Sequence, residues 1–506
     1  MKRITSPIAT LLALALSSPA VLAQTVTTSP QAATQPTDAT DATPGISDVR
    51  IVRLSQARGK VEMDRNTGNG FETAFPNLPV TQGAKLRTGE GVAEIEFEDN
   101  STLRLAPDTV VEFPQLNRTA TGATLSAVNV LKGTVYVGLA KASQTIANTF
   151  TLTCDRGKIV LSPASHIRLD VGSPETGLAV FDGNVQFETA SGATDVGKKK
   201  ALLFSSATQT TPTLVSKIDS GPFDDWDKTQ TDFHKRYANA SAFAGSPYLY
   251  GLADMNYYGA FADLPGCGRV WRPYFASAAW DPFANGVWAW YPGTGYTWVS
   301  VYPWGWAPFR YGNWQQCGAG GWGWQPGGRW VGLHEPRQPH NPIHHPFPPR
   351  PPHQPLPGGS TLVAVNTKPL NFSKFNSATS TFVFHNDSAG LGVPRESFGK
   401  LAQASAMTAQ HGFVATPVYS GYSGEGNRTG GRGEYNAARS GQANSTASRS
   451  SGASTRSSAA ASQSRSSVSA SSSYSGGGSH ASYSAPASAP SAAASSSSSA
   501  AAPAHH

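Results

Sequence analysis

The stretch from Gly268 to Trp330 constrains the fold of this chain more than any other part of it. Eleven of the chain's twelve tryptophans lie between Trp271 and Trp330. Each buried aromatic ring removes about 150–250 Å² from water, so a dozen rings can build a core where Leu and Val are scarce. The stretch therefore predicts a small Trp-rich module whose rings are able to serve as its core.

Three pairs of tryptophans within it are separated by one residue: Trp288 and Trp290, Trp304 and Trp306, Trp322 and Trp324. Alternate residues of a β-strand point to the same side, so this spacing predicts that both rings of a pair share one face of a strand. Dipeptides rich in Gly, Pro and Asn favour turns around the pairs. These are Asn285-Gly286, Pro292-Gly293, Gly312-Asn313 and Pro326-Gly327. We expect short, tight hairpins.

Two interpretations of the rings remain open at this point. In the first, they form the core of the module. In the second, some of them form an exposed platform that stacks on a glycan or on another protein, because a face of tryptophan in water implies a partner. The candidate platform residues are Trp288, Trp290, Trp298, Trp304 and Trp306.

The N-terminus has the pattern of a secretory signal peptide. Lys2 and Arg3 precede a short apolar run, and small residues end at Ala23, where we expect cleavage. The run is shorter than a comfortable transmembrane helix, and no second candidate span follows. The sequence therefore predicts a periplasmic or secreted protein without a membrane span, in which residues 24–47, rich in Thr, Ala, Pro and Gln, form a disordered linker.

The net charge does not indicate a nucleic-acid partner. The formal charge is +7, but the signal peptide and residues 421–506 carry nearly all of it. The rest of the chain is close to neutral and has no basic stripe with interleaved aromatic residues. We therefore expect no nucleic acid among the partners.

Residues 48–205 have the pattern of an all-β domain. Ala93, Ile95 and Phe97 alternate with polar residues, and after a turn Leu103 and Leu105 do the same. This period of two, with one buried face, predicts a hairpin, and similar segments recur through the region. Residues 206–240 then predict a linker and a helix, with acidic residues in the first turn and Lys235 and Arg236 in the last. We expect the helix to dock by its aromatic side, through Trp226, Phe233 and Tyr237.

Several short segments of the β region resemble the FecR-type periplasmic domain. They are Gln56 to Val61, Leu86 to Gly91, Ser101 to Leu105, Leu131 to Val135 and Val180 to Val185. The best-known members of that family sense occupied iron transporters, and carry a cytoplasmic anti-sigma segment and a membrane span. Neither is expected here. The resemblance implies a β-rich interaction domain on the envelope side and no individual functional residue.

Residues 241–335 predict the small Trp-rich β module, and within them the segment from Leu252 through Trp330 resembles a second family, a tryptophan- and proline-rich domain of unknown function often found after FecR domains in exported bacterial proteins. The segments that carry the resemblance are Tyr258-Gly259, Gly268 to Pro273, Tyr296 to Ser300, Pro303 to Pro308 and Tyr311 to Trp314. The resemblance implies an architecture and an exported setting, and it brings no known activity.

The chain has three cysteines, and export permits disulfides. Cys267 and Cys317 bracket most of the aromatic stretch, and we predict that they pair. Closing a loop of this length stabilises by about 4 kcal/mol in the chain-entropy model. Cys154, on an apolar strand face, is predicted to be a buried thiol outside that disulfide.

The C-terminal third contains less folding information. Residues 336–359 predict an extended Pro/His-rich spacer, in which proline-rich sequence fixes no tetrahedral site, so no metal is expected. Residues 360–420 predict a small, partly ordered segment with a strand pair against the aromatic module. Residues 421–506, rich in Ser, Ala and Gly, cannot bury a core and predict a disordered tail.

The sequence thus predicts a mainly β protein: a FecR-like all-β domain, one linking helix, a small Trp-rich hairpin module and a long disordered tail. No catalytic signature stands out, so we expect no enzyme, no catalytic residue and no cofactor. The hypothesis is a non-catalytic exported envelope protein that binds a protein or a glycan such as peptidoglycan. A purely structural or scaffold role is the alternative, and a cell-wall hydrolase is the third.

Overall fold

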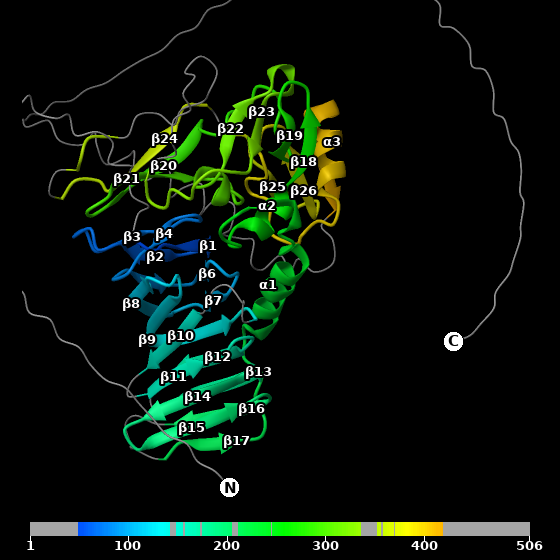
Figure 1. Ribbon diagram of the computed structural model, residues 1–506. Helices are drawn as coiled ribbons and strands as arrows, with labels where there is room; N and C mark the ends of the chain where they lie inside the picture. The colour runs from blue at the N-terminus through cyan, green and yellow to red at the C-terminus, as the bar shows by residue number, and fades with distance from the viewer. Residues whose placement is uncertain are drawn as a thin grey trace, which may run out of the picture. The chain divides into compact units, whose positions relative to one another are not determined.

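The computed structural model describes residues 49–417, except 142–147, 155–156, 173–174, 205–210, 244, 335–351, 356–357 and 369. The chain separates into two units, residues 1–447 and 448–506, and all the described residues lie in the first. The predicted signal peptide, the linker, the tail and most of the Pro/His-rich spacer lie outside the described residues. The described part is mainly β, as predicted (Figure 1).

The first seventeen strands form one continuous sheet, which we call the β domain. The long strand β9, Thr124–Gly138, belongs to both of its layers. The second half of β9 pairs with β7 and β12, and the first half pairs with β8 and, in parallel, with β10. Rings from the two layers meet in the core, where the ring centres of Phe97 and Phe150 lie 5.2 Å apart and those of Phe187 and Phe204 lie 4.4 Å apart.

The first layer has the strand order β4-β1-β6-β7-β9-β12-β13-β16-β17. Its strands besides β9 are β4 Pro79–Val80, β1 Val52–Arg58, β6 Val92–Glu96, β7 Thr102–Leu105, β12 His166–Val171, β13 Thr176–Asp182, β16 Lys200–Phe204 and β17 Thr213–Val215. The second layer has the order β3-β2-β5-β8-β9-β10-β11-β14-β15. Its strands are β3 Phe71–Thr73, β2 Val61–Asp64, β5 Lys85–Thr88, β8 Val110–Arg118, β10 Asn148–Cys154, β11 Gly157–Leu161, β14 Asn184–Thr189 and β15 Gly192–Gly197.

The predicted hairpin is strands β6 and β7, which pair Ala93 with Leu105 and Ile95 with Leu103. These apolar side chains are buried in the core, as the alternation predicted. The expectation of a single buried face was wrong, however. Glu94 and Glu96, on the opposite face of β6, are also fully buried, because further elements of the chain cover that side.

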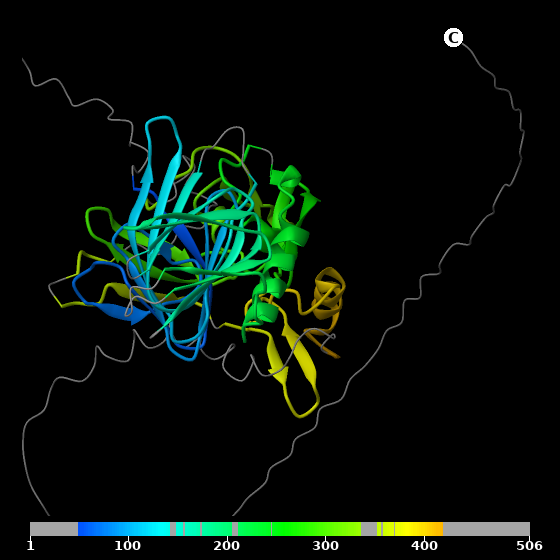
Figure 2. The ribbon, with the colours of Figure 1, turned by 90° about the horizontal axis from the view of Figure 1, so that it is seen from below.

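The predicted helix is α1, Asp224–Tyr237, with three aspartates in its first turn and basic residues in its last. It lies alongside the β domain in both views (Figure 1, Figure 2). The expectation that it docks by its aromatic side holds for Phe233 and for Tyr237, which is half-buried with its ring centre 5.1 Å from that of Tyr257. Only Phe233 of the three predicted aromatic residues is buried, and the other buried residues of the helix are Asp227, Gln230 and His234. No helix among the described residues is long and apolar enough to span a membrane.

The aromatic module, residues 241–334, contains two small sheets. One has the order β18-β19-β23-β22, and in the other β20 lies between β21 and β24. Its elements are η1 Ser241–Phe243, α2 Leu252–Tyr258, β18 Gly259–Leu264, β19 Gly268–Pro273, β20 Asn285–Tyr291, β21 Gly295–Ser300, η2 Ala307–Phe309, β22 Asn313–Gln316, η3 Gly318–Gly320 and β23 Trp322–Gln325. Pro292-Gly293 makes the turn between β20 and β21, as predicted. Asn285-Gly286 begins a strand instead of forming a turn.

The pairing of tryptophans on strands is confirmed for β20 and β23 and wrong for Trp304 and Trp306. These two lie in turns before η2 rather than on a strand. Gly305 lies between them at a position with no room for a side chain, since an added Cβ would come within 2.3 Å of the Ser300 hydroxyl oxygen. The spacing of two is therefore produced here by a turn that directs both indoles into the core.

The C-terminal segment, residues 352–417, completes the aromatic module. Strand β24, Leu362–Asn366, pairs with β20, while β25 Lys374–Asn376, β26 Thr381–His385 and β27 Phe413–Pro417 form a sheet of their own. Helix α3, Leu401–His411, was not predicted. The Trp304 indole donates to the Ala389 carbonyl at 2.6 Å, and Phe275 stacks on Phe384 at 5.0 Å. The segment is therefore packed into the module and is not an appendage.

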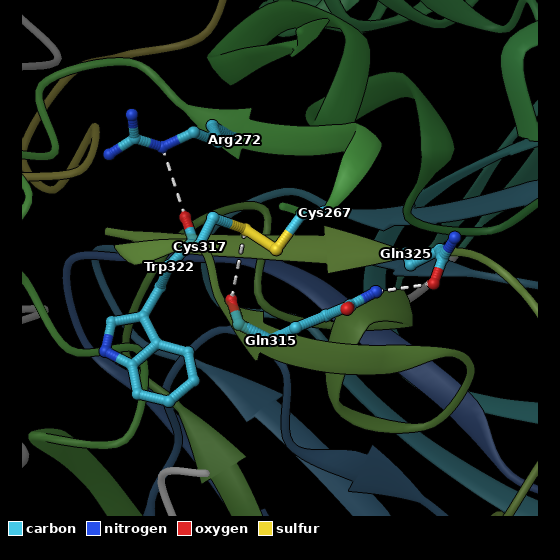
Figure 3. The surroundings of a disulfide bond; sticks show 6 residues. All are labelled: Cys267, Arg272, Gln315, Cys317, Trp322 and Gln325. Carbon is cyan, nitrogen blue, oxygen red and sulfur yellow. Dashed lines mark hydrogen bonds between the residues drawn. A yellow bond between two sulfur atoms is a disulfide. The ribbon is translucent and has the colours of Figure 1, made fainter. Parts of the chain in front are cut away.

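The predicted disulfide joins Cys267 and Cys317, whose Cα atoms are 5.5 Å apart (Figure 3). It ties the turn between β18 and β19 to the end of β22. Nearby, the Arg272 Nε atom donates to the Trp322 carbonyl at 3.1 Å, which holds the neighbouring strand β23 in place. Cys154 lies outside this disulfide and is buried.

Candidate functional site

The structure places the five candidate platform tryptophans mostly in the core. Trp288, Trp298, Trp304 and Trp306 are each at most 2% exposed, so they present no face to a ligand, and the platform prediction is wrong for these four. Burial supports the alternative interpretation of the rings as core. Trp290 is partly exposed, with its ring 5.2 Å from that of Tyr296, and its role in binding stays a prediction.

The structure instead brings together a set of residues that the sequence did not predict. They form a buried cluster of charged side chains where the β domain, α1, the aromatic module and the C-terminal segment meet. We call this cluster the ionic junction. It consists of Arg53, Glu94, Glu96, Arg104, Asp227, His234, Asp254 and Arg395.

Two pairs of directly opposed residues on neighbouring strands form the part of the junction that lies on the outer face of the first layer. Glu94 lies opposite Arg104 in the β6–β7 ladder, and Arg53 lies opposite Glu96 in the β1–β6 ladder. Directly opposed residues point to the same side of a sheet, so both pairs can form across neighbouring strands. The Arg104–Glu94 and Arg53–Glu96 contacts are 2.7 and 2.8 Å long.

Glu94 is the centre of the junction. One of its carboxylate oxygens contacts Arg104. The other accepts hydrogen bonds from Arg395 and from the Ser55 hydroxyl, each at 2.6 Å, and lies 3.0 Å from the His234 ring nitrogen. Burial by itself raises the pKa of this carboxyl group. The charges of His234, Arg395 and Arg104 outweigh that effect and hold the pKa well below its usual value.

Asp254 of α2 links the aromatic module to the same cluster. It contacts Arg53 of the β domain at 2.7 Å and accepts two hydrogen bonds from Arg395, at 2.8 and 2.7 Å. Arg395 therefore connects a carboxylate of the β domain, Glu94, with one of the aromatic module. Its guanidinium also lies 4.9 Å from the centre of the Phe233 ring of α1, so three parts of the chain converge on this one side chain.

Helix α1 is attached to the sheet through its acidic side. Asp227 contacts Arg104 at 2.7 Å and the His166 ring at 2.7 Å. One turn earlier, Asp224 accepts from Arg168 at 2.8 Å and from the Tyr136 hydroxyl at 2.9 Å. These contacts explain why the buried face of α1 is polar as well as aromatic.

Hydrogen bonds from side chains to backbone carbonyls extend the same interface beyond the ion pairs. The Asn77 side chain donates to the carbonyls of Ser300 and Tyr302, at 3.1 and 2.7 Å, and the Tyr291 hydroxyl donates to the Pro79 carbonyl at 2.6 Å. Arg65 donates to the Trp290 carbonyl at 2.6 Å. Because each donor lies on one module and its acceptor on the other, the contacts specify a single mutual placement of the two.

The chemistry of the junction is structural. Each carboxylate contacts at least one guanidinium group and is no more than 2% exposed. A general acid and base must reach a substrate, and these groups are covered. Within the described ranges no group of three His, Cys, Asp or Glu side chains is arranged to hold a metal ion. The arrangement can hold the two modules in one geometry, and it can respond to the loss of charge.

Acidification tests this electrostatic role. The folded-state pKa of Glu94 is depressed, so its contribution to stability is present above the unfolded value and is lost as pH falls through the folded value. We expect the urea midpoint to fall as pH drops below about 4.5. Glu94→Gln should show a smaller acid-dependent loss, measured by urea unfolding between pH 7 and pH 3. Equal acid dependence in both proteins would contradict the assignment.

Family models match part of each of the two modules. The family described as FecR protein matches residues 84–186, and a family of unknown function, DUF6600, matches residues 252–336. Two crystal structures of a candidate anti-sigma factor from Parabacteroides distasonis ATCC 8503 share 10% identity with the chain at a TM-score of 0.23. The matches cover 28% and 35% of this chain, and 63% and 93% of those chains. A likeness this low carries no argument about function. No curated protein matches the chain.

Proposed function

Because the chain is a FecR-like protein with a C-terminal domain of unknown function, we propose that it is a non-catalytic, exported protein of the cell envelope that binds a protein partner through a free edge strand of its β domain. The signal-peptide pattern ending at Ala23 supports export to the periplasm or beyond. The burial of the tryptophans and the pairing of the carboxylates favour neither a glycan platform nor a hydrolase.

The observation that carries the proposal is the free edge of the first layer. Within the described residues, β17 pairs only with β16. An edge strand with unpaired backbone groups is a template for strand addition by another chain. Leu214, in the middle of β17, is 46% exposed, which leaves an apolar side chain at this edge for a partner to cover.

The charge at this edge indicates the kind of segment that fits. Lys200 begins β16, and Lys217 lies just beyond β17, at the end of the ladder where Ala201 pairs with Val215. Lys199 precedes them in the turn, and all three lysines are exposed. An extended protein segment with acidic side chains would add to β17 and neutralise this group.

The test is photo-crosslinking of the full-length chain in bacterial cells. A photoreactive phenylalanine replaces Leu214 or, as a matched control, Leu131, an exposed leucine on β9. We expect the protein to be recovered in the envelope fraction with Gln24 as its first residue. We also expect a crosslink to another protein from position 214 and none from position 131. Lys200→Glu combined with Lys217→Glu should reduce the adduct several-fold.

Three outcomes oppose the proposal. Equal adducts at positions 214 and 131 would mean non-specific contact. If the protein instead co-sediments with purified peptidoglycan in a saturable way and forms no crosslink to another protein, the result would favour the glycan alternative. Neither adduct nor sedimentation would favour a purely structural role.

A further inference from the structure

Arg310 is a buried charged residue that the ionic junction does not include. It follows η2 in the aromatic module and is 2% exposed. Its guanidinium carbon lies 3.7 Å from the centre of the Trp306 ring, a close stacking contact. Its Nη1 atom donates to the Trp306 carbonyl at 3.4 Å, which is a long hydrogen bond.

The other buried arginines show what Arg310 lacks. Each arginine that is nine-tenths or more buried, apart from Arg310, contacts a carboxylate at 2.7 or 2.8 Å. They are Arg50, Arg53, Arg65, Arg104, Arg168 and Arg395. Among the described residues Arg310 forms no ion pair, although an unpaired buried charge is costly.

The hydrogen-bond donors of this side chain are mostly unsatisfied within the described residues. Within the described part of the chain, Arg310 Nε and Nη2 and the Trp306 Nε1 atom have no hydrogen-bond partner. The hydroxyls of Tyr291 and Tyr250, which lie near Arg310, donate to the Pro79 and Ile51 carbonyls, and within the described residues neither oxygen accepts a hydrogen bond from Arg310 Nε or Nη2. Arg53 adds positive charge close by.

The charge on Arg310 persists at neutral pH. Burial lowers its pKa to about 10, and the proximity of Arg53 acts in the same direction. A pKa of about 10 still leaves the guanidinium protonated at pH 7. A stable fold therefore calls for a negative charge at the side of the guanidinium that carries Nε and Nη2.

We propose that Arg310 and Trp306 form a binding site for one small monovalent anion of the size of chloride, which accepts hydrogen bonds from Arg310 Nε and Nη2 with the Trp306 N–H beside them. Such an anion supplies the counter-charge that none of the described residues provides. Tyr250 and Tyr291, whose hydroxyls contact the β domain, lie near this guanidinium, so the anion would also stabilise the contact between the two modules. The site is independent of the proposed partner at β17.

The first experiment compares sodium chloride with sodium gluconate at equal ionic strength, since gluconate is monovalent but large. We expect chloride to raise the Tm of the full chain saturably, by about 2–4 °C more than gluconate. Arg310→Met, which fills similar space without charge, should lose this difference. Arg329→Met, at an exposed arginine of the same module, should keep it.

The second measurement is independent of how Arg310→Met folds. Crystals of the unmodified chain grown in bromide should show an anomalous peak within hydrogen-bonding distance of Arg310 Nε or Nη2. The proposal is wrong if chloride and gluconate act alike on the unmodified chain, if the difference survives in Arg310→Met, or if bromide gives no peak at Arg310.

Discussion

Replacing Glu94 with glutamine should lower the free energy of unfolding by about 3–5 kcal/mol, because removing one member of a buried ion pair leaves its partners' charges uncompensated. Glu94 is fully buried and contacts Arg104, Arg395 and His234. Glutamine keeps the shape of the side chain, so the loss reports on charge and hydrogen bonding rather than on a cavity. The measurement is urea unfolding at pH 7, followed by circular dichroism and tryptophan fluorescence.

The matched control is Glu188→Gln, which removes an exposed ion pair with Lys158 on the second layer of the β domain. Exposed pairs contribute about 0–1 kcal/mol, so this variant should unfold close to the parent. A double-mutant cycle of Glu94→Gln with Arg395→Met should show a coupling of about 0.5–3 kcal/mol, since the two side chains touch. Additive effects, or equal losses in Glu94→Gln and Glu188→Gln, would show that the junction does not hold the modules together.

Replacing both Cys267 and Cys317 with alanine should cost about 4 kcal/mol of stability in the chain-entropy model, because the disulfide closes a loop with a sequence separation of 50. Eight of the twelve tryptophans lie inside this loop, so their fluorescence reports directly on its unfolding. We expect the double variant to unfold at a markedly lower concentration of guanidinium chloride than the parent, with the midpoint of unfolding measured by tryptophan emission.

Reductant provides the control for this prediction. It should lower the midpoint of the parent to that of the double variant and leave the variant itself unchanged. Cys154→Ala should respond to reductant as the parent does, because Cys154 lies outside the disulfide. A parent whose midpoint is unaffected by complete reduction would contradict the stabilising role of the bond.

The patterns that depend on neighbouring residues were predictable from the sequence. Alternation over Ala93 to Leu105 predicted the β6–β7 hairpin, and the charge order of residues 224–237 predicted α1. Cysteine arithmetic predicted the disulfide between Cys267 and Cys317. The density of tryptophan predicted an aromatic module, because so few aliphatic residues leave no other material for its core.

The ionic junction was not predictable in this way. Glu94 and Glu96 have the alternation of a solvent-facing strand side, and nothing local indicates that α1, α2 and the C-terminal segment cover it. Arg395 lies about three hundred positions from Glu94, in a segment whose sequence has no periodic pattern. A weak signal was present in the register, which places Arg104 opposite Glu94, but such pairs also form on exposed faces.

The sequence by itself therefore determined the β class, the linking helix, the disulfide and the presence of a Trp-rich module, since each follows from periodicity, the order of charges, cysteine count or composition within a short window. Only the tertiary structure decided that Trp304 and Trp306 turn inward, that the polar face of β6 is covered, and that Arg310 is buried without a carboxylate partner among the described residues. The physical reason is that burial and charge compensation depend on which distant segments pack together, and local sequence carries no record of that choice.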